Sequence, residues 1–466
     1  MLTRENMWPY QVQTAEHIKN NLGAGCLIDM GLGKTVSTAT AILDLIMMGE
    51  LGKVLIVAPK RVAESTWPDE FKKWSHLTGL KISTVLGTQT QRLAALKANA
   101  DVYTTNYENV VWLLAHLGGR KMFDMLVLDE SSRVKNPSAQ RTKALKKALG
   151  MFERRVILTG TPVPNGYIDL WSQIYMLDKG KRLGETITNY RAQYFRPDKS
   201  NGHIVYSYAL REKGYAKIIQ ERISDMCVSM KAKDYLQLPE MLMQTETIKL
   251  QEFSAMYEKF ERDLVMSLPD DEEITAFNTA ALRAKLRQFC SGAIYNGKDE
   301  KDYSEIHTLK IDALNEIVED CNGSPILVFY EFQHTKARIE KHLAKYKPRQ
   351  IKTDKDIKDW NEGKITLALG HPASIGHGLN LQFGGHRCIW FDMTDNMENY
   401  EQANRRLLRQ GQRHDVVCKH LVAELDKGET IDHIVLKRTQ GKIATQDEFM
   451  EALKARIINI KKSVAE

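Results

Sequence analysis

Residues 25–35 read Gly-Cys-Leu-Ile-Asp-Met-Gly-Leu-Gly-Lys-Thr, and they predict a strand, a tight turn and the start of a helix. The turn contains Gly31 and Gly33, which let successive backbone N–H groups face an anion. Lys34 and Thr35 then open a helical pattern over residues 36–48. This construction is typical of a loop that holds the phosphates of a nucleotide, with Lys34 on the β and γ phosphates and the Thr35 hydroxyl on Mg²⁺.

The strict eight-residue phosphate-loop pattern is incomplete, because Ile28 stands where its first glycine would be. A turn that merely caps a helix would also contain Gly33, Lys34 and Thr35. The rest of the chain has to separate these two interpretations.

Length and composition limit the number of lobes, the class of protein and the compartment that we expect. The 466 residues are enough for two lobes with cores of their own. The hydrophobic content of 43% and charged content of 27% are ordinary for a soluble protein, and the net charge of +7 permits an anionic partner. Six cysteines lie far apart, without the spacing of a zinc site or a disulfide framework, so we expect a reducing compartment. Without an apolar signal segment or membrane-spanning run, we expect a cytoplasmic protein with no membrane partner.

Apolar runs of strand length alternate with helical patterns at residues 54–58, 102–105, 125–128 and 156–159. This alternation predicts an α/β fold in which helices wrap a parallel sheet. The rhythm resumes at residues 326–329, 365–369, 388–391 and 416–421, which predicts a second α/β lobe. Charged helical patterns dominate from about 178 to 324, so we expect a helical insert between the lobes. We place lobe one at 1–230 (core about 5–180, helical extension to 230) and lobe two at 231–466 (helical insert 231–305, core about 306–450).

Two acids follow the apolar run at 125–128. Hydrolysis of a nucleotide requires a carboxylate for the metal, a base for the attacking water and a positive charge on the transferred phosphoryl group. We expect Asp129 to hold Mg²⁺, partly through water, and Glu130 to take the proton of the attacking water. Paired acids after a strand are also a common helix cap, so this assignment depends on the phosphate loop that precedes them.

The positive charge is predicted to come from the second lobe. Residues 402–412 contain Arg406 and Arg409, whose spacing of three would place both on one face of a helix. Such a run of arginines more often forms a basic helix whose charged side chains face solvent. Here the repeated arginines suit side chains that reach the γ-phosphate when the two lobes close.

With these residues in place, the chain resembles the SWI/SNF-type ATPases of helicase superfamily two over nearly its whole length. The most diagnostic segments are Val-Lys-Asn-Pro at 134–137 and Leu-Thr-Gly-Thr-Pro at 158–162, followed by Asn165, Leu170 and Trp171. The remaining motifs of the family match, in order, residues 8–11, 29–35, 58–61 with Trp67 to Trp74, Lys310 with Leu314, 326–330, 376–381 and 402–412.

The resemblance implies two tandem RecA-like lobes of the phosphate-loop NTPase class that use ATP and Mg²⁺. The nucleotide contacts that it implies are Tyr10, Gln11, Asp29, Met30, Gly31, Leu32, Gly33, Lys34, Thr35 and Gly378, with Gln11 reading the base. The metal ligands are Thr35 and Asp129, and the catalytic residues are Lys34, Asp129, Glu130, Arg406 and Arg409. The nucleic-acid contacts that we expect are Lys60, Arg61, Asn106, Thr159, Thr161, Ser374 and Asn380.

The family mostly tracks along a DNA duplex without separating it, so we expect a DNA-dependent ATPase that translocates on duplex DNA with little sequence preference. A strand-separating DNA or RNA helicase in replication, recombination or repair remains an alternative. So does an ATP-switched clamp that binds DNA and recruits partners. We expect a monomer of a stand-alone prokaryotic or phage type, in the host cytoplasm if phage-encoded. A nuclease or a replication or recombination protein is a candidate partner.

The chain departs from the family pattern directly after the two acids. Ser131 and Ser132 stand where the family usually has Ala-His or a near equivalent. That histidine is thought to couple the nucleotide site to the other lobe. We therefore expect hydrolysis to be retained and coupling to differ.

Overall fold

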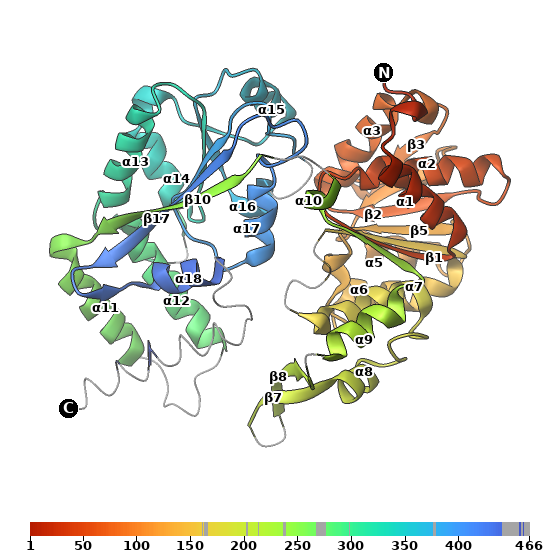
Figure 1. Ribbon diagram of the computed structural model, residues 1–466, viewed down its shortest axis with the longest axis horizontal. Helices are drawn as coiled ribbons and strands as arrows, with labels where there is room; N and C mark the ends of the chain where they lie inside the picture. Colours follow the sequence, from red (N-terminus) through yellow and green to blue (C-terminus); the bar gives the residue numbers. More distant parts are fainter. Residues whose placement is uncertain are drawn as a thin grey trace. The chain divides into compact units, whose positions relative to one another are not determined.

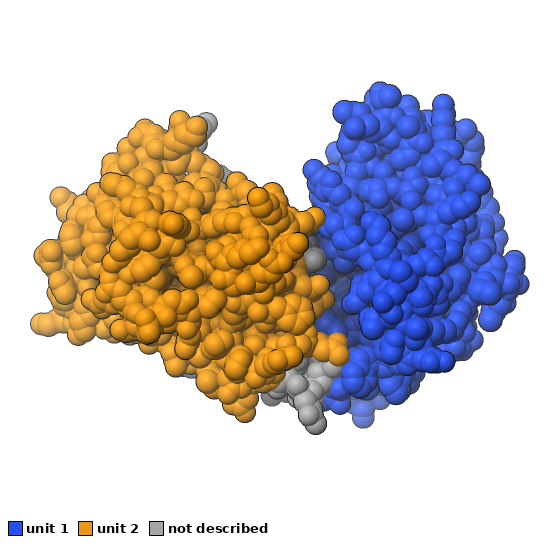
Figure 2. Space-filling view, turned by 90° about the horizontal axis from the view of Figure 1, so that it is seen from above, with its two compact units in different colours: residues 1–237 blue, residues 238–466 orange. Residues whose placement is uncertain are grey.

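The computed structural model describes residues 1–160, 162, 166–201, 204–212, 214–235, 239–266, 276–297, 299–375, 379–439, 456, 457 and 460. The chain divides into two compact units, residues 1–237 and 238–466, which are coloured separately in Figure 2. Each unit is built around its own sheet (Figure 1). Among the described residues, no helix combines the length and apolar character needed to cross a lipid bilayer.

The sheet of unit 1 has seven strands in the order β3-β4-β2-β5-β6-β1-β9, and every neighbouring pair is parallel. Its strands are β1 (Gly23–Ile28), β2 (Val54–Ala58), β3 (Ile82–Thr84), β4 (Val102–Asn106), β5 (Met125–Asp129), β6 (Arg154–Thr159) and β9 (Cys227–Met230). The predicted strands at 54–58, 102–105, 125–128 and 156–159 are thus confirmed. The strand order places β6 between β1 and β5, although β6 comes last of the three in the chain.

Helices accompany these strands, as an alternating pattern requires. They are α1 (Pro9–Asn20), α2 (Lys34–Met47), α3 (Trp67–Lys73), α4 (Gln89–Lys97), α5 (Val110–Leu117), α6 (Gln140–Ala148), α7 (Leu170–Asp178), α8 (Ile187–Tyr194), α9 (Gly214–Ile223) and α10 (Ala232–Tyr235). Side chains of α5, α6 and α7 pack with Leu126 and Leu128 of β5 in one core. Val127, which points to the other face, is also fully buried, so both faces of the strand are covered.

Unit 2 repeats this architecture, with the sheet order β10-β17-β16-β13-β15-β14 and a short β18 beside β17. The strands are β10 (Met241–Lys249), β13 (Ile326–Phe329), β14 (Arg349–Gln350), β15 (Leu367–Gly370), β16 (Arg387–Trp390), β17 (Val416–Leu425) and β18 (Gly428–Glu429). The helices are α11 (Ser254–Met266), α12 (Ala276–Ser291), α13 (Leu309–Asp320), α14 (Gln333–His342), α15 (Asp354–Asn361), α16 (Pro372–Ile375), α17 (Met397–Asn404) and α18 (Ile431–Thr439). Alternate residues of β13 belong to two separate cores, so this sheet too is covered on both faces.

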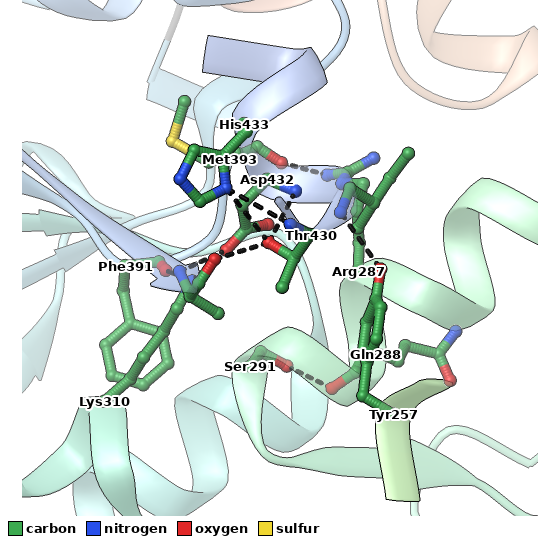
Figure 3. Close-up of polar contacts among 12 residues, drawn as sticks. Tyr257, Arg287, Gln288, Ser291, Lys310, Phe391, Met393, Thr430, Asp432 and His433 are labelled. Atoms are coloured by element: carbon green, nitrogen blue, oxygen red, sulfur yellow. Dashed lines mark hydrogen bonds and ion pairs between the residues drawn. The ribbon is translucent and has the colours of Figure 1, made fainter. Parts of the chain in front are cut away.

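A buried ion pair joins several elements of unit 2 (Figure 3). Lys310, at the start of α13, donates from Nζ to Asp432 Oδ2 at 2.7 Å and to the carbonyl of Phe391 at 3.1 Å. The side chains of Lys310 and Asp432 are 1% and 2% exposed. Asp432, in α18, also accepts from the backbone N–H of Ala423 in β17. The pair therefore ties α13 and α18 to the ends of β16 and β17.

The region expected to be a helical insert also contains strands. The strands β7 (Phe195–Asn201) and β8 (Ile204–Leu210) form an antiparallel hairpin, and β11 (Ala293–Tyr295) pairs with β12 (Tyr303–Glu305). More importantly, β9 completes the sheet of unit 1 and β10 that of unit 2. β9 has only four residues, and most of β10 is exposed or half-buried, so neither shows a clear hydrophobic alternation. Pairing with a neighbouring strand, rather than local pattern, decides their conformation.

Candidate functional site

Three loops meet at the carboxyl edge of the sheet of unit 1. The strand order β5-β6-β1 brings together the loop after β1, which contains Gly31 and Gly33, the loop after β6, which begins at Gly160, and the two acids at the end of β5. Ligands of open parallel sheets bind at this edge. The order of strands thus gathers in space the residues that the sequence spreads from 29 to 160.

The phosphate loop has the backbone that its glycines predict. Gly31 and Gly33 have φ of +88° and +74°, in the left-handed region that favours glycine, and α2 begins immediately afterwards. Lys34 Nζ donates to the carbonyl oxygens of Ile28 at 2.7 Å and Asp29 at 3.3 Å. The helix N-terminus and the amine therefore lie at the same loop, as binding of a phosphate requires.

The start of α1 packs directly on this loop. The backbone N–H of Trp8 donates to Gln11 Oε1 at 2.9 Å, which orients the amide of Gln11. A β-carbon at Gly33 would lie 2.2 Å from Gln11 Nε2, so the amide of Gln11 touches the loop where only glycine fits. Tyr10 is 5% exposed, and burial raises the pKa of its phenol. The structure thus places Gln11 against the phosphate loop, and Tyr10 precedes it in the same helix.

Asp129 ends β5 as a buried carboxylate, 7% exposed. Burial raises its pKa, while the charge of Lys34 and a hydrogen bond from Trp67 act in the opposite direction. That bond runs from the indole Nε1 to Asp129 Oδ2 at 3.0 Å. The carboxylate of Asp129 is therefore stabilised by groups from two other segments, the charge of Lys34 and the indole N–H of Trp67.

Glu130 follows with an unusual backbone. Its φ of +56° and ψ of +61° are left-handed, a conformation that costs a non-glycine residue free energy and that occurs often at functional sites. The hydroxyl of Tyr107 donates to the carbonyl of Asp129 at 2.8 Å and lies 3.3 Å from that of Glu130. Burial, with the two nearby acids, raises the pKa of Tyr107 well above its ordinary value, so the phenol keeps its donor proton. Tyr107 thereby holds the turn that sets the direction of Glu130.

Three of the residues expected to contact nucleic acid, Lys60, Arg61 and Asn106, lie at the ends of β2 and β4, farther along the same edge. Ala58 of β2 pairs with Asn106 of β4, so Lys60 and Arg61 lie near Asn106 at adjacent strand ends. Lys60 is exposed and Arg61 is half-buried. Asn106 is 7% exposed, and Thr159 is fully buried at the end of β6, so the hydroxyl of Thr159 is not presented to solvent. Thr161 lies outside the described residues.

In unit 2, the two arginines are not on a helix, contrary to the prediction. α17 ends at Asn404, and Arg406 and Arg409 lie in the turn that follows. Both guanidinium groups reach the same acceptor, the carbonyl of Leu379, at 3.2 and 3.3 Å. Side-chain hydrogen bonds to the segment at 379–385 take the place of helical backbone bonds here. Gln412, for example, donates to the carbonyls of Gln382 and Gly385. The arginines nevertheless lie close together, as expected.

Ser374, in α16, and Asn380 are both exposed in unit 2. The side chain of Asn361 donates to the carbonyl of Asn380 at 2.8 Å, which holds that segment. Gly378 lies outside the described residues.

Sequence reasoning missed two residues that support the acids. Trp67 and Tyr107 are both buried, and each uses its polar atom on the Asp129 turn. Trp67, Trp74 and Trp171 all belong to segments that match family motifs, and all three side chains are buried. A buried indole or phenol usually finds a hydrogen-bond partner, which is a signal that a partner exists but does not identify it.

The residues at this edge fit a nucleotide with Mg²⁺. The hydroxyl of Thr35 and the carboxylate of Asp129 are the oxygen ligands that Mg²⁺ prefers. The amine of Lys34 bonds to two neutral carbonyls of its own loop, acceptors that a phosphate oxygen can replace with a gain in charge attraction. The left-handed glycines leave backbone N–H groups for the remaining phosphate oxygens.

Several known proteins are similar to this chain. The SNF2-related domain matches residues 10–293 of the chain. Protein p41 of Acyrthosiphon pisum secondary endosymbiont phage 1 is 38% identical over 96% of this chain and 98% of its own length. An uncharacterized ATP-dependent helicase of Mycoplasma genitalium is 26% identical over 90% of this chain, which spans 40% of that protein.

A solved structure is also similar to this chain. The SWI2/SNF2 ATPase core of Sulfolobus solfataricus, solved in complex with dsDNA, is 20% identical to it, with a TM-score of 0.45, over 97% of this chain and 93% of that one. The match to the domain covers more than half of the sequence, and the phage protein is similar from end to end. The chain therefore belongs to the SNF2-related family of helicase-like ATPases.

Proposed function

We propose that this protein is a DNA-dependent ATPase that translocates along duplex DNA without marked sequence preference. The observation that carries the proposal is the carboxyl edge of the sheet in unit 1, where the phosphate loop, two acids and exposed basic residues follow neighbouring strands. Membership of the family supports ATP as the nucleotide. We assign residues 1–230 to the ATP-binding lobe and residues 231–466 to the second lobe.

The residues of unit 1 divide the chemical work. Lys34 and the N-terminus of α2 bind the β and γ phosphates, and Gln11 recognises the base. Glu130 accepts the proton of the attacking water, with the Tyr107 bond holding its backbone. Mg²⁺, held by Thr35 and Asp129, supplies positive charge to the phosphates when bound. Arg406 and Arg409 of unit 2 stabilise the charge that develops on the transferred phosphoryl group.

The nucleic-acid track runs along the same edge of the sheet, on the side away from the phosphate loop. Lys60 and Arg61 supply positive charge, and Asn106 keeps a buried Oδ1 that has no hydrogen-bond partner within the described part of the chain. Ser374 and Asn380 of unit 2 supply further polar groups. Cations, hydroxyls and amides bind the DNA backbone rather than base edges, so the contact carries little sequence preference.

ATP turnover measured with duplex DNA, single-stranded DNA, RNA or no nucleic acid tests the proposal. Turnover should rise most with duplex DNA, and its stimulation should weaken as salt increases. Lys34→Ala and Glu130→Gln should each abolish turnover, while Glu130→Gln should still bind ATP because it keeps the phosphate loop intact. Equal turnover under all four conditions would support a nucleotide-switched clamp instead.

Displacement of a triplex-forming strand from duplex DNA separates translocation from unwinding. A translocase should displace the third strand in an ATP-dependent way and leave a forked duplex intact. Unwinding of the fork without displacement of the third strand would contradict the translocase assignment. The Glu130→Gln variant is the control, since it should bind DNA and ATP and displace nothing.

A further inference from the structure

Gln173 lies in the first turns of α7 and is fully buried in unit 1. Its Nε2 donates to the carbonyl of Pro162 at 2.6 Å and to that of Asp169 at 3.0 Å. Its Oε1 accepts a hydrogen bond from Ser131 Oγ at 2.7 Å. Since both backbone partners are carbonyl oxygens, the nitrogen must face them, and this determines that Ser131 is a donor.

These bonds connect two of the loops at the carboxyl edge. Ser131 directly follows Glu130, the residue with the left-handed backbone. Pro162 lies in the loop after β6, two residues beyond Gly160. The amide of Gln173 is therefore a single rigid link between the turn of the base and the loop after β6. A buried amide that lost one of these partners could not replace it with water, so the two loops are constrained to move together.

The first residue of the loop after β6, Gly160, lies close to the start of the phosphate loop. A β-carbon built at Gly160 would lie 3.5 Å from Met30 Cγ and 3.6 Å from the carbonyl oxygen of Ile28, which is ordinary contact distance. The same carbonyl accepts from Lys34 Nζ. Hydrogen bonds thus run from Pro162 through Gln173 to Ser131, and Gly160 lies close to Ile28, the residue whose carbonyl accepts from Lys34.

Ser172, the neighbour of Gln173, makes a different connection. Its hydroxyl donates to the carbonyl of Val134 at 2.6 Å, in the short helical segment Ser131–Val134 that follows Glu130. This bond holds the segment that follows Glu130 to α7, and within the described residues no hydrogen bond joins Ser172 to Gly160 or Pro162. Ser172 is 1% exposed, so the two residues have similar burial and differ in which loops they join.

We propose that Gln173 is a positioning residue that couples the loop after β6 to the general base Glu130 through Ser131. This inference rests on the proposed function, because it assigns to the coupled movement the stimulation of ATP hydrolysis by DNA. Ser131 occupies the first of the two positions at which the chain departs from the family pattern. Alanine, the usual residue there, has no hydroxyl, so the hydrogen bond from Ser131 to Gln173 depends on this departure.

The test measures kcat and KM for ATP, with and without saturating duplex DNA, for the full chain and three variants. Gln173→Met keeps the length of the side chain and removes its bonds, and Ser131→Ala removes the donor. Both should lower the DNA-stimulated kcat about tenfold, the effect of about 1.4 kcal/mol on the barrier, with little change in KM for ATP or in DNA affinity. Ser172→Ala, the matched control, should keep its stimulation.

A double variant makes the test specific. If the bond between Ser131 and Gln173 carries the coupling, Ser131→Ala together with Gln173→Met should lower the stimulated kcat no further than Gln173→Met alone. Three outcomes would overturn the inference. DNA could stimulate all variants equally, or the losses of the two single variants could add in the double variant. Ser172→Ala could also lose stimulation, with the loss in each variant following its melting temperature. A wild-type protein that DNA does not stimulate would instead refute the proposed function.

Discussion

Gly33 and Gly49 have almost the same backbone, with φ of +74° and +73°, at opposite ends of α2. Only at Gly33 would a β-carbon meet another group, Gln11 Nε2 at 2.2 Å, whereas nothing lies within 4 Å at Gly49. We therefore predict that Gly33→Ala displaces Gln11 and lowers ATP affinity at least about tenfold, a loss of about 1.4 kcal/mol. Gly49→Ala should cost only backbone strain of about 1 kcal/mol and leave ATP affinity unchanged. Titration with a fluorescent ATP analogue, beside melting curves, distinguishes the two. Equal affinities would contradict the packing of Gln11 on the loop.

Trp67 and Trp171 are both fully buried, and each donates a hydrogen bond from its indole. Trp67 donates to the carboxylate of Asp129, and Trp171 donates to the carbonyl of Gly184 at 2.8 Å. Burial already raises the pKa of Asp129, and the bond from Trp67 lowers it. We predict that Trp67→Phe raises this pKa further, so the carboxylate protonates at higher pH and the acidic limb of the kcat profile moves to higher pH. More Mg²⁺ should also be needed for half-maximal turnover. Trp171→Phe should lower the melting temperature without moving the profile, and a shift in both variants would refute this role.

At the scale of secondary-structure elements, contacts with neighbouring segments determine where short strands form and where helices end. β9 and β10 come from the region between the lobes and each completes a sheet, although neither has a periodic pattern of its own. α17 ends at Asn404, whose Oδ1 accepts from the buried indole of Trp390 at 3.0 Å. The arginines that follow then turn back to Leu379 instead of continuing the helix.

The buried pair of Lys310 and Asp432 links several elements of unit 2, so we expect it to affect the stability of that unit (Figure 3). Lys310→Met leaves Asp432 buried without its cation, and we expect a loss of about 3–5 kcal/mol in the free energy of unfolding. Adding Asp432→Asn should recover part of that loss, because the remaining group is neutral. Lys345→Met removes a cation from an ion pair of the same length, 2.7 Å, whose side chains are 57% and 52% exposed, and should change stability little. Urea unfolding curves measure all three, and equal losses from Lys310→Met and Lys345→Met would contradict the argument.

For the whole molecule, the prediction concerns the division of the active residues between the units. The phosphate loop and both acids belong to unit 1, while Arg406 and Arg409 belong to unit 2. We predict that replacing both arginines by alanine lowers DNA-stimulated turnover at least about 10³-fold, because they would stabilise charge only in the transition state. ATP affinity should remain within severalfold of the wild type. Arg413→Ala, an exposed arginine of the same segment, is the control. Undiminished turnover of the double variant would contradict the proposed role of the two arginines.

The sequence by itself determined the features that arise from neighbouring residues. The phosphate loop, the strands that alternate with helices and the two acids after β5 follow from backbone preference and hydrophobic period, which act over a few residues. Only the tertiary structure decided the strand order that inserts β6 between β1 and β5, and with it the proximity of Gly160 to Met30. It also decided the bonds of Trp67 to Asp129 and of Gln173 to Ser131, across 62 and 42 positions of the chain. The physical reason is that a buried polar atom takes the partner that the packed fold brings to it, and local sequence cannot specify that partner.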